Sequence, residues 1–121
     1  RDLKPHNILV SKDYSVVKIA DFNVSKFMNP DSKMKYCSLD RGNYKMWTHT
    51  GTIAFNAPEI FEELEYTEAV DMWSAGCVLY SMLSGKNPFE AEYIEDMIEK
   101  IKEAKVKFDD EIWEYISKDA K

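Results

Sequence analysis

The sequence predicts a mainly α-helical fold with one small β-hairpin, for three reasons. Two short runs rich in β-branched residues, NILV and SVVKIA, lie near the N-terminus on either side of the polar turn SKDY. A later run, AVDMWSAGCVLYSML, is apolar on nearly every side, and the segment after it repeats apolar residues at helical spacing. A helix that is apolar all round needs neighbours to cover it, so we expect one packed unit around a central helix.

The hairpin is expected at residues 7–10 and 15–19, because short β-rich runs separated by a polar turn are typical of paired strands. Residues 21–59 show no sustained period of either kind. An irregular stretch of that length in a small domain is usually functional.

The central helix is expected at residues 69–83, with Thr67 as its N-cap and with Gly85 and Pro88 ending it. A second, amphipathic helix is predicted by five apolar positions at helical spacing, with acids early and lysines late as the helix dipole favours: Ala91, Ile94, Met97, Ile98 and Ile101. The last residues, 108–121, predict a loop that leads into a further helix near Ser117.

Composition narrows the class of protein. The chain has 121 residues and a net charge of −6, and the negative surplus lies in residues 51–121, which argues against a nucleic-acid partner. The longest apolar run contains Asp71 and is shorter than the roughly 20 residues of a membrane span. Two cysteines without a leading targeting segment are typical of reduced thiols. We therefore expect a soluble, cytoplasmic protein.

Three acidic or amide side chains near the N-terminus suggest a site: Asp2, Asn7 and Asp21. Pro5 stiffens the loop between the first two, and Asp21 ends the second strand. The hairpin would place Asn7 and Asp21 side by side as hard oxygen ligands for a magnesium ion that binds phosphate. Lys4 would stand beside Asp2 as a compact positive charge suited to a phosphoryl group. Singly, an aspartate at a strand end is more often a turn residue, so the joint spacing carries this interpretation.

Four motifs follow one another in the chain: D-L-K-P-x-N at residues 2–7, D-F at 21–22, A-P-E at 57–59 and D-x-W-S-x-G at 71–76. Their order resembles the motif set of protein kinases. The resemblance implies that residues 1–121 are a partial kinase domain of the α+β kinase-like fold. This part would run from the catalytic loop through the family's helix G to the start of its helix H, in the C-terminal lobe. The small lobe and the C-terminal end of the domain would lie outside it.

The resemblance implies a role for each motif residue. Asp2 would be the catalytic base that accepts the proton of the substrate hydroxyl, and Lys4 would stabilise the transferred phosphoryl group. Asn7 and Asp21 match the magnesium ligands, so the implied cofactors are ATP and Mg²⁺. The L-K-P form is the Ser/Thr-kinase one. Leu9 falls either under the adenine ring or in a plain β-core position, and the sequence leaves both open.

The irregular residues 21–59 then resemble an activation segment. Thr52, in the G-T pair, would bridge the catalytic aspartate and lysine by hydrogen bonds. Thr48 stands where many members carry an activating phosphothreonine, which would pair with Arg1, and Thr50 is the second candidate. A threonine that is never modified remains the alternative.

Two further residues resemble structural supports, and one departs from the family. Asp71 would support Asp2 by accepting backbone N–H bonds from the catalytic loop. Glu59 would pair with an arginine further along the family's sequence. Asn23 replaces the glycine of D-F-G, a position that often needs left-handed backbone angles, which asparagine tolerates better than other non-glycine residues.

The C-terminal phrase F-x-x-x-x-W-x-x-I-S-x-x-A-K, preceded by GKNPF, is similar to the calcium/calmodulin-dependent kinase group. The resemblance implies ATP-dependent phosphorylation of Ser or Thr in protein substrates by the full-length parent, with these 121 residues alone inactive. Candidate partners are an upstream activating kinase or a calcium-linked regulator. The alternative function is a non-catalytic pseudokinase or scaffold module; the unusual Asn23 favours it, and the four intact motif residues Asp2, Lys4, Asn7 and Asp21 argue against it.

Overall fold

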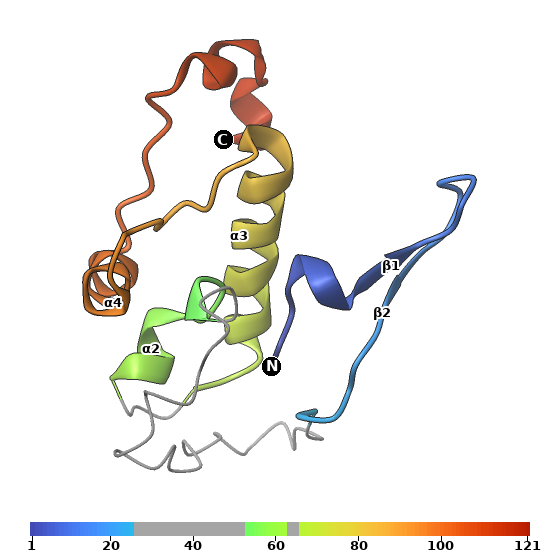
Figure 1. Cartoon of the computed structure of the whole chain (residues 1–121), viewed down its shortest axis with the longest axis horizontal. Coiled ribbons are helices and arrows are strands. Elements are labelled where there is room, and N and C mark those ends of the chain that lie inside the picture. The colour runs from blue at the N-terminus through green and yellow to red at the C-terminus, as the bar shows by residue number, and fades with distance from the viewer. Residues whose placement is uncertain (26–52, 63–65) are drawn as a thin grey trace.

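A computed structural model describes residues 1–25, 53–62 and 66–121 of the chain (Figure 1). Within these ranges the structure has one two-stranded sheet, three α-helices and three short 3-10 helices. The strands are β1 (Ile8–Val10) and β2 (Val17–Ile19), and the α-helices are α2 (Pro58–Phe61), α3 (Ala69–Ser84) and α4 (Ile94–Glu103). The 3-10 helices are Pro5–Asn7, Glu111–Tyr115 and Lys118–Ala120.

The hairpin is confirmed at its expected place, although each strand has only three residues. β1 and β2 are antiparallel, with Ile8 opposite Ile19 and Val10 opposite Val17. Figure 1 shows the hairpin extending away from the helices, and most of its side chains are exposed.

The turn of the hairpin is held by Asp13. Its two carboxylate oxygens accept hydrogen bonds from the hydroxyls of Ser11, at 2.6 Å, and Ser15, at 2.8 Å. These bonds favour the charged carboxylate and lower the pKa of Asp13 to about 2.

The ends of α3 differ in part from the expectation. The helix ends where predicted, because Gly85 adopts φ 73° and its N–H bonds to the Ser81 carbonyl, which is the left-handed stop that glycine allows. At its start, Glu68 occupies the N-cap position and makes no capping bond. Thr67 lies one residue too early: its Oγ1 accepts the N–H of Ala69, at 3.3 Å, in a local turn.

The expectation that the central helix is buried on every side is wrong for this chain. One face is buried, through Val70, Ser74, Cys77 and Val78. The opposite side exposes large apolar side chains, with Met72 73% and Met82 75% exposed. An all-round apolar pattern needs neighbours on all sides, and the described elements pack against one side only.

The main hydrophobic core is formed by residues 53–55, by α3, by Phe89 in the segment after α3, and by α4. Its buried members are Ile53, Ala54, Phe55, Cys77, Val78, Phe89, Met97 and Ile101. Trp73 of α3 stacks on Phe89 with the ring centroids 5.4 Å apart. The prediction of an amphipathic second helix is confirmed, since α4 buries Met97 and Ile101 and keeps its charged residues outward.

The C-terminal segment forms two 3-10 helices, and the start of a helix expected near Ser117 is present as the short 3-10 turn Lys118–Ala120. Trp113 is 2% exposed and packs edge-on against Phe108, at 4.8 Å between centroids. Tyr80 of α3 ties this segment down by donating its hydroxyl to the Lys107 carbonyl, at 2.9 Å.

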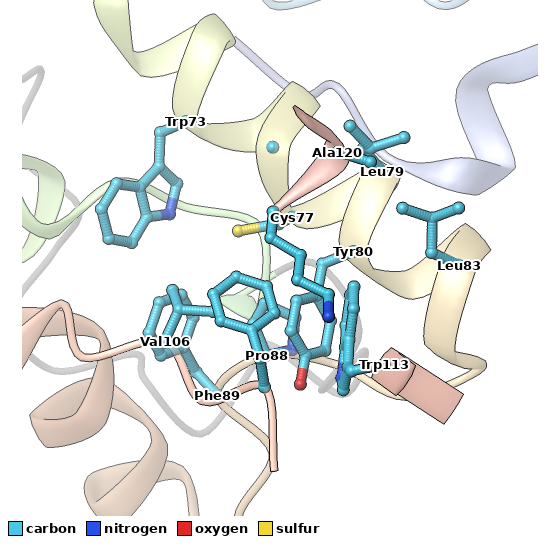
Figure 2. A pocket seen from close by; sticks show the side chains of 13 residues that line it. Trp73, Cys77, Leu79, Tyr80, Leu83, Pro88, Phe89, Val106, Trp113 and Ala120 are labelled. Atoms are coloured by element: carbon cyan, nitrogen blue, oxygen red, sulfur yellow. The ribbon is translucent and has the colours of Figure 1, made fainter. Parts of the chain in front are cut away.

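A pocket of about 320 Å³ lies between α3 and the C-terminal segment. Figure 2 shows its mainly apolar lining, which includes Trp73, Leu79, Leu83 and Trp113. None of the site residues predicted from the sequence lines it, so this pocket is separate from the candidate active site. No helix in the described ranges has both the length and the apolar character that crossing a membrane requires.

Candidate active site

The loop between Asp2 and Asn7 folds back on itself. Lys4 is extended, with φ −155°, and Pro5 then starts the 3-10 turn Pro5–Asn7, whose fixed φ suits a first helical position. The N–H of Asn7 bonds to the Lys4 carbonyl at 2.9 Å. This reversal brings the side chain of Asn7 against Asp2.

Asp2 is held by two neighbours in this loop. Lys4 Nζ lies 2.7 Å from Asp2 Oδ2, with the two side chains about one-fifth exposed. Asn7 Nδ2 donates to the Asp2 carbonyl at 2.8 Å and to Asp2 Oδ2 at 3.2 Å, and Asn7 is 7% exposed. Among the described residues Asp2 Oδ1 accepts no hydrogen bond. Within the described part of the chain the carboxylate is therefore fixed through Oδ2.

The structure brings Asn7 and Asp21 to the same end of the hairpin. The Ala20 N–H bonds to the Asn7 carbonyl at 2.8 Å, which continues the ladder by one step beyond β1 and β2, and Asp21 is the next residue. Because Asn7 Nδ2 faces the acceptors on Asp2, the amide oxygen is the atom of Asn7 that would serve as a metal ligand.

An amide oxygen and a carboxylate suit a Mg²⁺ ion that keeps several of its waters. In the described part of the chain no three His, Cys, Asp or Glu side chains gather closely enough to form a fuller metal cage. The donor types are compatible with Mg²⁺, which Asn7 and Asp21 would hold.

The left-handed residue of this region is Asp21, with φ 61°, and Asn23 has a negative φ. Position 23 therefore does not need the left-handed backbone angles that would favour asparagine over other non-glycine residues. Instead the Asn23 N–H bonds to Asp21 Oδ1 at 3.3 Å, and the Ser25 N–H bonds to the Phe22 carbonyl at 3.0 Å. Residues 21–25 thus form one compact turn.

Arg1 joins the loop to distant parts of the chain. Its Nε donates to the Val24 carbonyl at 2.7 Å, and its Nη1 donates to the Tyr66 hydroxyl at 3.2 Å. Its main-chain nitrogen lies 3.1 Å from Asp71 Oδ1. The Asp71 side chain as a whole is 48% exposed, although Oδ1 itself is turned inward.

Sequence reasoning missed Tyr66 and Val24. They come from positions 65 and 23 residues away from Arg1, and no motif or spacing in the sequence links them to it.

The remaining predicted residues are placed as follows. Leu9 lies on β1 and is 57% exposed, which does not support its interpretation as a buried β-core residue. Glu59 lies in the first turn of α2, and within the described ranges it has no ion pair. Thr48, Thr50 and Thr52 lie outside the described residues.

All of residues 1–121 match the family model described as the protein kinase domain. The chain belongs to the protein kinase family. The kinase resemblance predicted from the four motifs is confirmed.

Individual relatives indicate which group of protein kinases the chain resembles. It is 37% identical, over all of its length, to myosin light chain kinase A of Dictyostelium discoideum, and 36% identical, over 98% of its length, to a probable myosin light chain kinase of the same organism. It is 35% identical, over all of its length, to a calcium/calmodulin-dependent protein kinase of Metarhizium anisopliae. The likeness to the calcium/calmodulin-dependent group is confirmed. The chain spans 38%, 21% and 29% of the length of these three relatives, respectively.

Proposed function

We propose that residues 1–121 belong to the larger lobe of a protein kinase whose full-length form carries out ATP-dependent phosphorylation of Ser or Thr in protein substrates. The observation that carries the proposal is the cluster of Asp2, Lys4 and Asn7, in which Asp2 Oδ2 is held by Lys4 Nζ at 2.7 Å and by Asn7 Nδ2 at 3.2 Å. A carboxylate fixed through one oxygen is suited to accept a proton from a hydroxyl group at the other.

In this proposal the substrate hydroxyl oxygen attacks the γ-phosphorus of ATP. A new O–P bond forms, the bond from the γ-phosphorus to its bridging oxygen breaks, and ADP leaves. The hydroxyl proton passes to Asp2 Oδ1. Lys4, held beside Asp2, supplies positive charge for the transferred group. Asn7 and Asp21 would hold Mg²⁺, which when bound neutralises charge on the phosphate oxygens.

Other residues of the motif set have supporting roles in the same proposal. Thr52 would bridge the catalytic aspartate and lysine, and Leu9, being half exposed, would contact the adenine ring. Phosphorylation of Thr48 by an upstream kinase would add a partner for the Arg1 guanidinium. Asp71 would support the catalytic loop through the Arg1 nitrogen, at 3.1 Å.

The names of the relatives support a more specific proposal about the kinase and its regulator. Kinases named for calcium/calmodulin dependence and for myosin light chain support a cytoplasmic Ser/Thr kinase acting on proteins, with a calcium-linked regulator as a candidate partner. The L-K-P form of the loop supports Ser/Thr rather than Tyr as the acceptor.

The test is Asp2→Asn in the full-length protein. Asparagine keeps the shape of the side chain but cannot take the proton, so we expect phosphotransfer to a generic Ser/Thr substrate to fall by about 10²- to 10⁴-fold. Asp109→Asn, an exposed change of the same chemistry, is the matched control and should retain full activity. Phosphotransfer at the wild-type rate by Asp2→Asn would refute the assignment. A wild-type protein that binds Mg-ATP without any transfer would favour the pseudokinase or scaffold alternative.

The isolated 121 residues should bind Mg-ATP weakly and transfer no phosphate. Their metal candidates are one amide and one exposed carboxylate, and Leu9 offers one half-exposed contact to the adenine ring. Isothermal calorimetry measures the affinity, and a low-micromolar dissociation constant would contradict this view of the site.

The role of Thr48 has a separate test. Mass spectrometry of the active full-length protein should find phosphate on Thr48, and Thr48→Ala should lower activity. A Thr48→Ala protein with undiminished activity would exclude the role.

A further inference from the structure

The Arg1 guanidinium bridges two segments of the chain. The kinase motifs do not account for this bridge, and neither does substrate binding. On one side Nε donates to the Val24 carbonyl at 2.7 Å, and on the other Nη1 donates to the Tyr66 hydroxyl at 3.2 Å. The guanidinium is a planar, rigid fork, so fixing one of its nitrogens also fixes the direction of the others. The position of the Tyr66 hydroxyl therefore decides where Nε points.

Tyr66 is well anchored for such a task. It is 6% exposed and packs with Ala57, which is fully buried, and with Val70, which is 2% exposed. Ala57 begins the A-P-E motif and Val70 lies in the first turn of α3. The tyrosine ring therefore packs against the residue that precedes α2 and against the first turn of α3, and its part-buried hydroxyl accepts a hydrogen bond from Arg1.

Val24 connects the bridge to the proposed metal ligand. It lies inside the compact turn of residues 21–25, which the bonds from Asn23 to Asp21 and from Ser25 to Phe22 close. A turn closed in this way moves as a unit. Holding the Val24 carbonyl therefore holds Asp21 at the end of the hairpin.

We propose that Tyr66 is a positioning residue that acts through Arg1: its hydroxyl orients the guanidinium, which holds the turn that carries Asp21 against the catalytic loop. The proposal deepens the proposed function and rests on it for the role of Asp21. The hydroxyl, rather than the ring, carries the effect, because the ring packs in its apolar cluster with or without the oxygen.

Tyr66→Phe in the full-length protein isolates the hydroxyl. We expect amide hydrogen exchange at residues 21–25, measured without nucleotide, to speed up about three- to tenfold, the range expected for the loss of one hydrogen bond. The Mg²⁺ concentration for half-maximal phosphotransfer should rise by a similar factor. Tyr80→Phe is the matched control, because it also loses one hydroxyl bond, to the Lys107 carbonyl at 2.9 Å, and should change neither quantity.

A double-mutant comparison separates action through Arg1 from a general loosening of the fold. In an Arg1→Lys background the fork is already gone, so adding Tyr66→Phe should speed exchange at residues 21–25 no further. Equal effects of Tyr66→Phe in both backgrounds, or unchanged exchange in the wild-type background, would overturn the proposal. A protein that transfers no phosphate contradicts the proposed function, whereas the exchange measurement still decides the role of Tyr66.

Discussion

Replacing Asn7 by aspartate reverses the polarity of the contact that holds Asp2. In the wild-type chain Asn7 Nδ2 donates to the Asp2 carbonyl at 2.8 Å and to Asp2 Oδ2 at 3.2 Å, in a site where Asn7 is 7% exposed. Asn7→Asp has nearly the same shape, but it presents an oxygen to both acceptors. Both hydrogen bonds are lost and two carboxylates face each other.

The cost follows from these contacts. The bond to the carbonyl contributes about 1 kcal/mol and the bond to the carboxylate about 1.5–3 kcal/mol. Two negative charges about 3.2 Å apart repel by about 5 kcal/mol at an effective dielectric constant of 20, and rotation of the new side chain relieves much of this. We expect Asn7→Asp to lower the free energy of unfolding by about 3–5 kcal/mol. Asn7→Ala, which loses the bonds without adding repulsion, should cost about 2–4 kcal/mol.

Urea unfolding of the full-length protein, followed by tryptophan fluorescence, measures these losses. Asn87→Asp is the matched control, because Asn87 Oδ1 accepts the Phe89 N–H at 3.1 Å and a carboxylate oxygen can do the same. An unfolding free energy for Asn7→Asp within about 0.5 kcal/mol of wild type would refute the argument.

Three further outcomes follow from side chains outside the site. Asp13 has a pKa of about 2, mainly because it accepts a hydrogen bond from Ser11 and, next in size, one from Ser15, so Ser11→Ala should move this pKa toward 3.8 in an NMR titration. The stability linked to Asp13 is present above pH 3.8 and is lost as pH falls through 2. An unmoved pKa would contradict the role of Ser11. Burial raises the pKa of Cys77 from 9.0 to about 11, so at pH 8 the thiol of the folded protein should react with a disulfide reagent about a hundredfold more slowly than the thiol of the urea-unfolded protein. The free energy of unfolding should also fall as pH rises from 9 to 11. Equal reaction rates in the folded and unfolded protein would refute the burial of this thiol. Trp113→Ala empties a site that is 2% exposed and should lower the unfolding free energy by about 3–5 kcal/mol, a loss that calorimetric melting detects and that a change under about 1 kcal/mol would disprove.

Local patterns account for what the sequence predicted correctly. The hairpin follows from two β-rich runs around a polar turn, and the amphipathic α4 follows from apolar spacing that one helix face satisfies alone. The expected position of Lys4 beside Asp2 agrees with the 2.7 Å contact between them, which two positions of separation in a proline-stiffened loop allow. In each case the interacting residues are close in the chain, so short-range geometry determines the contact.

The sequence by itself therefore determined the family, the hairpin, α4 and the position of Lys4 beside Asp2. Only the tertiary structure decided that Arg1 meets Tyr66 across 65 positions, that Asp21 rather than Asn23 takes the left-handed conformation, and that α3 buries one face. The physical reason is that these features depend on which segments pack against which. A residue pattern states what a helix can bury, but the neighbours that reach it determine what it does bury.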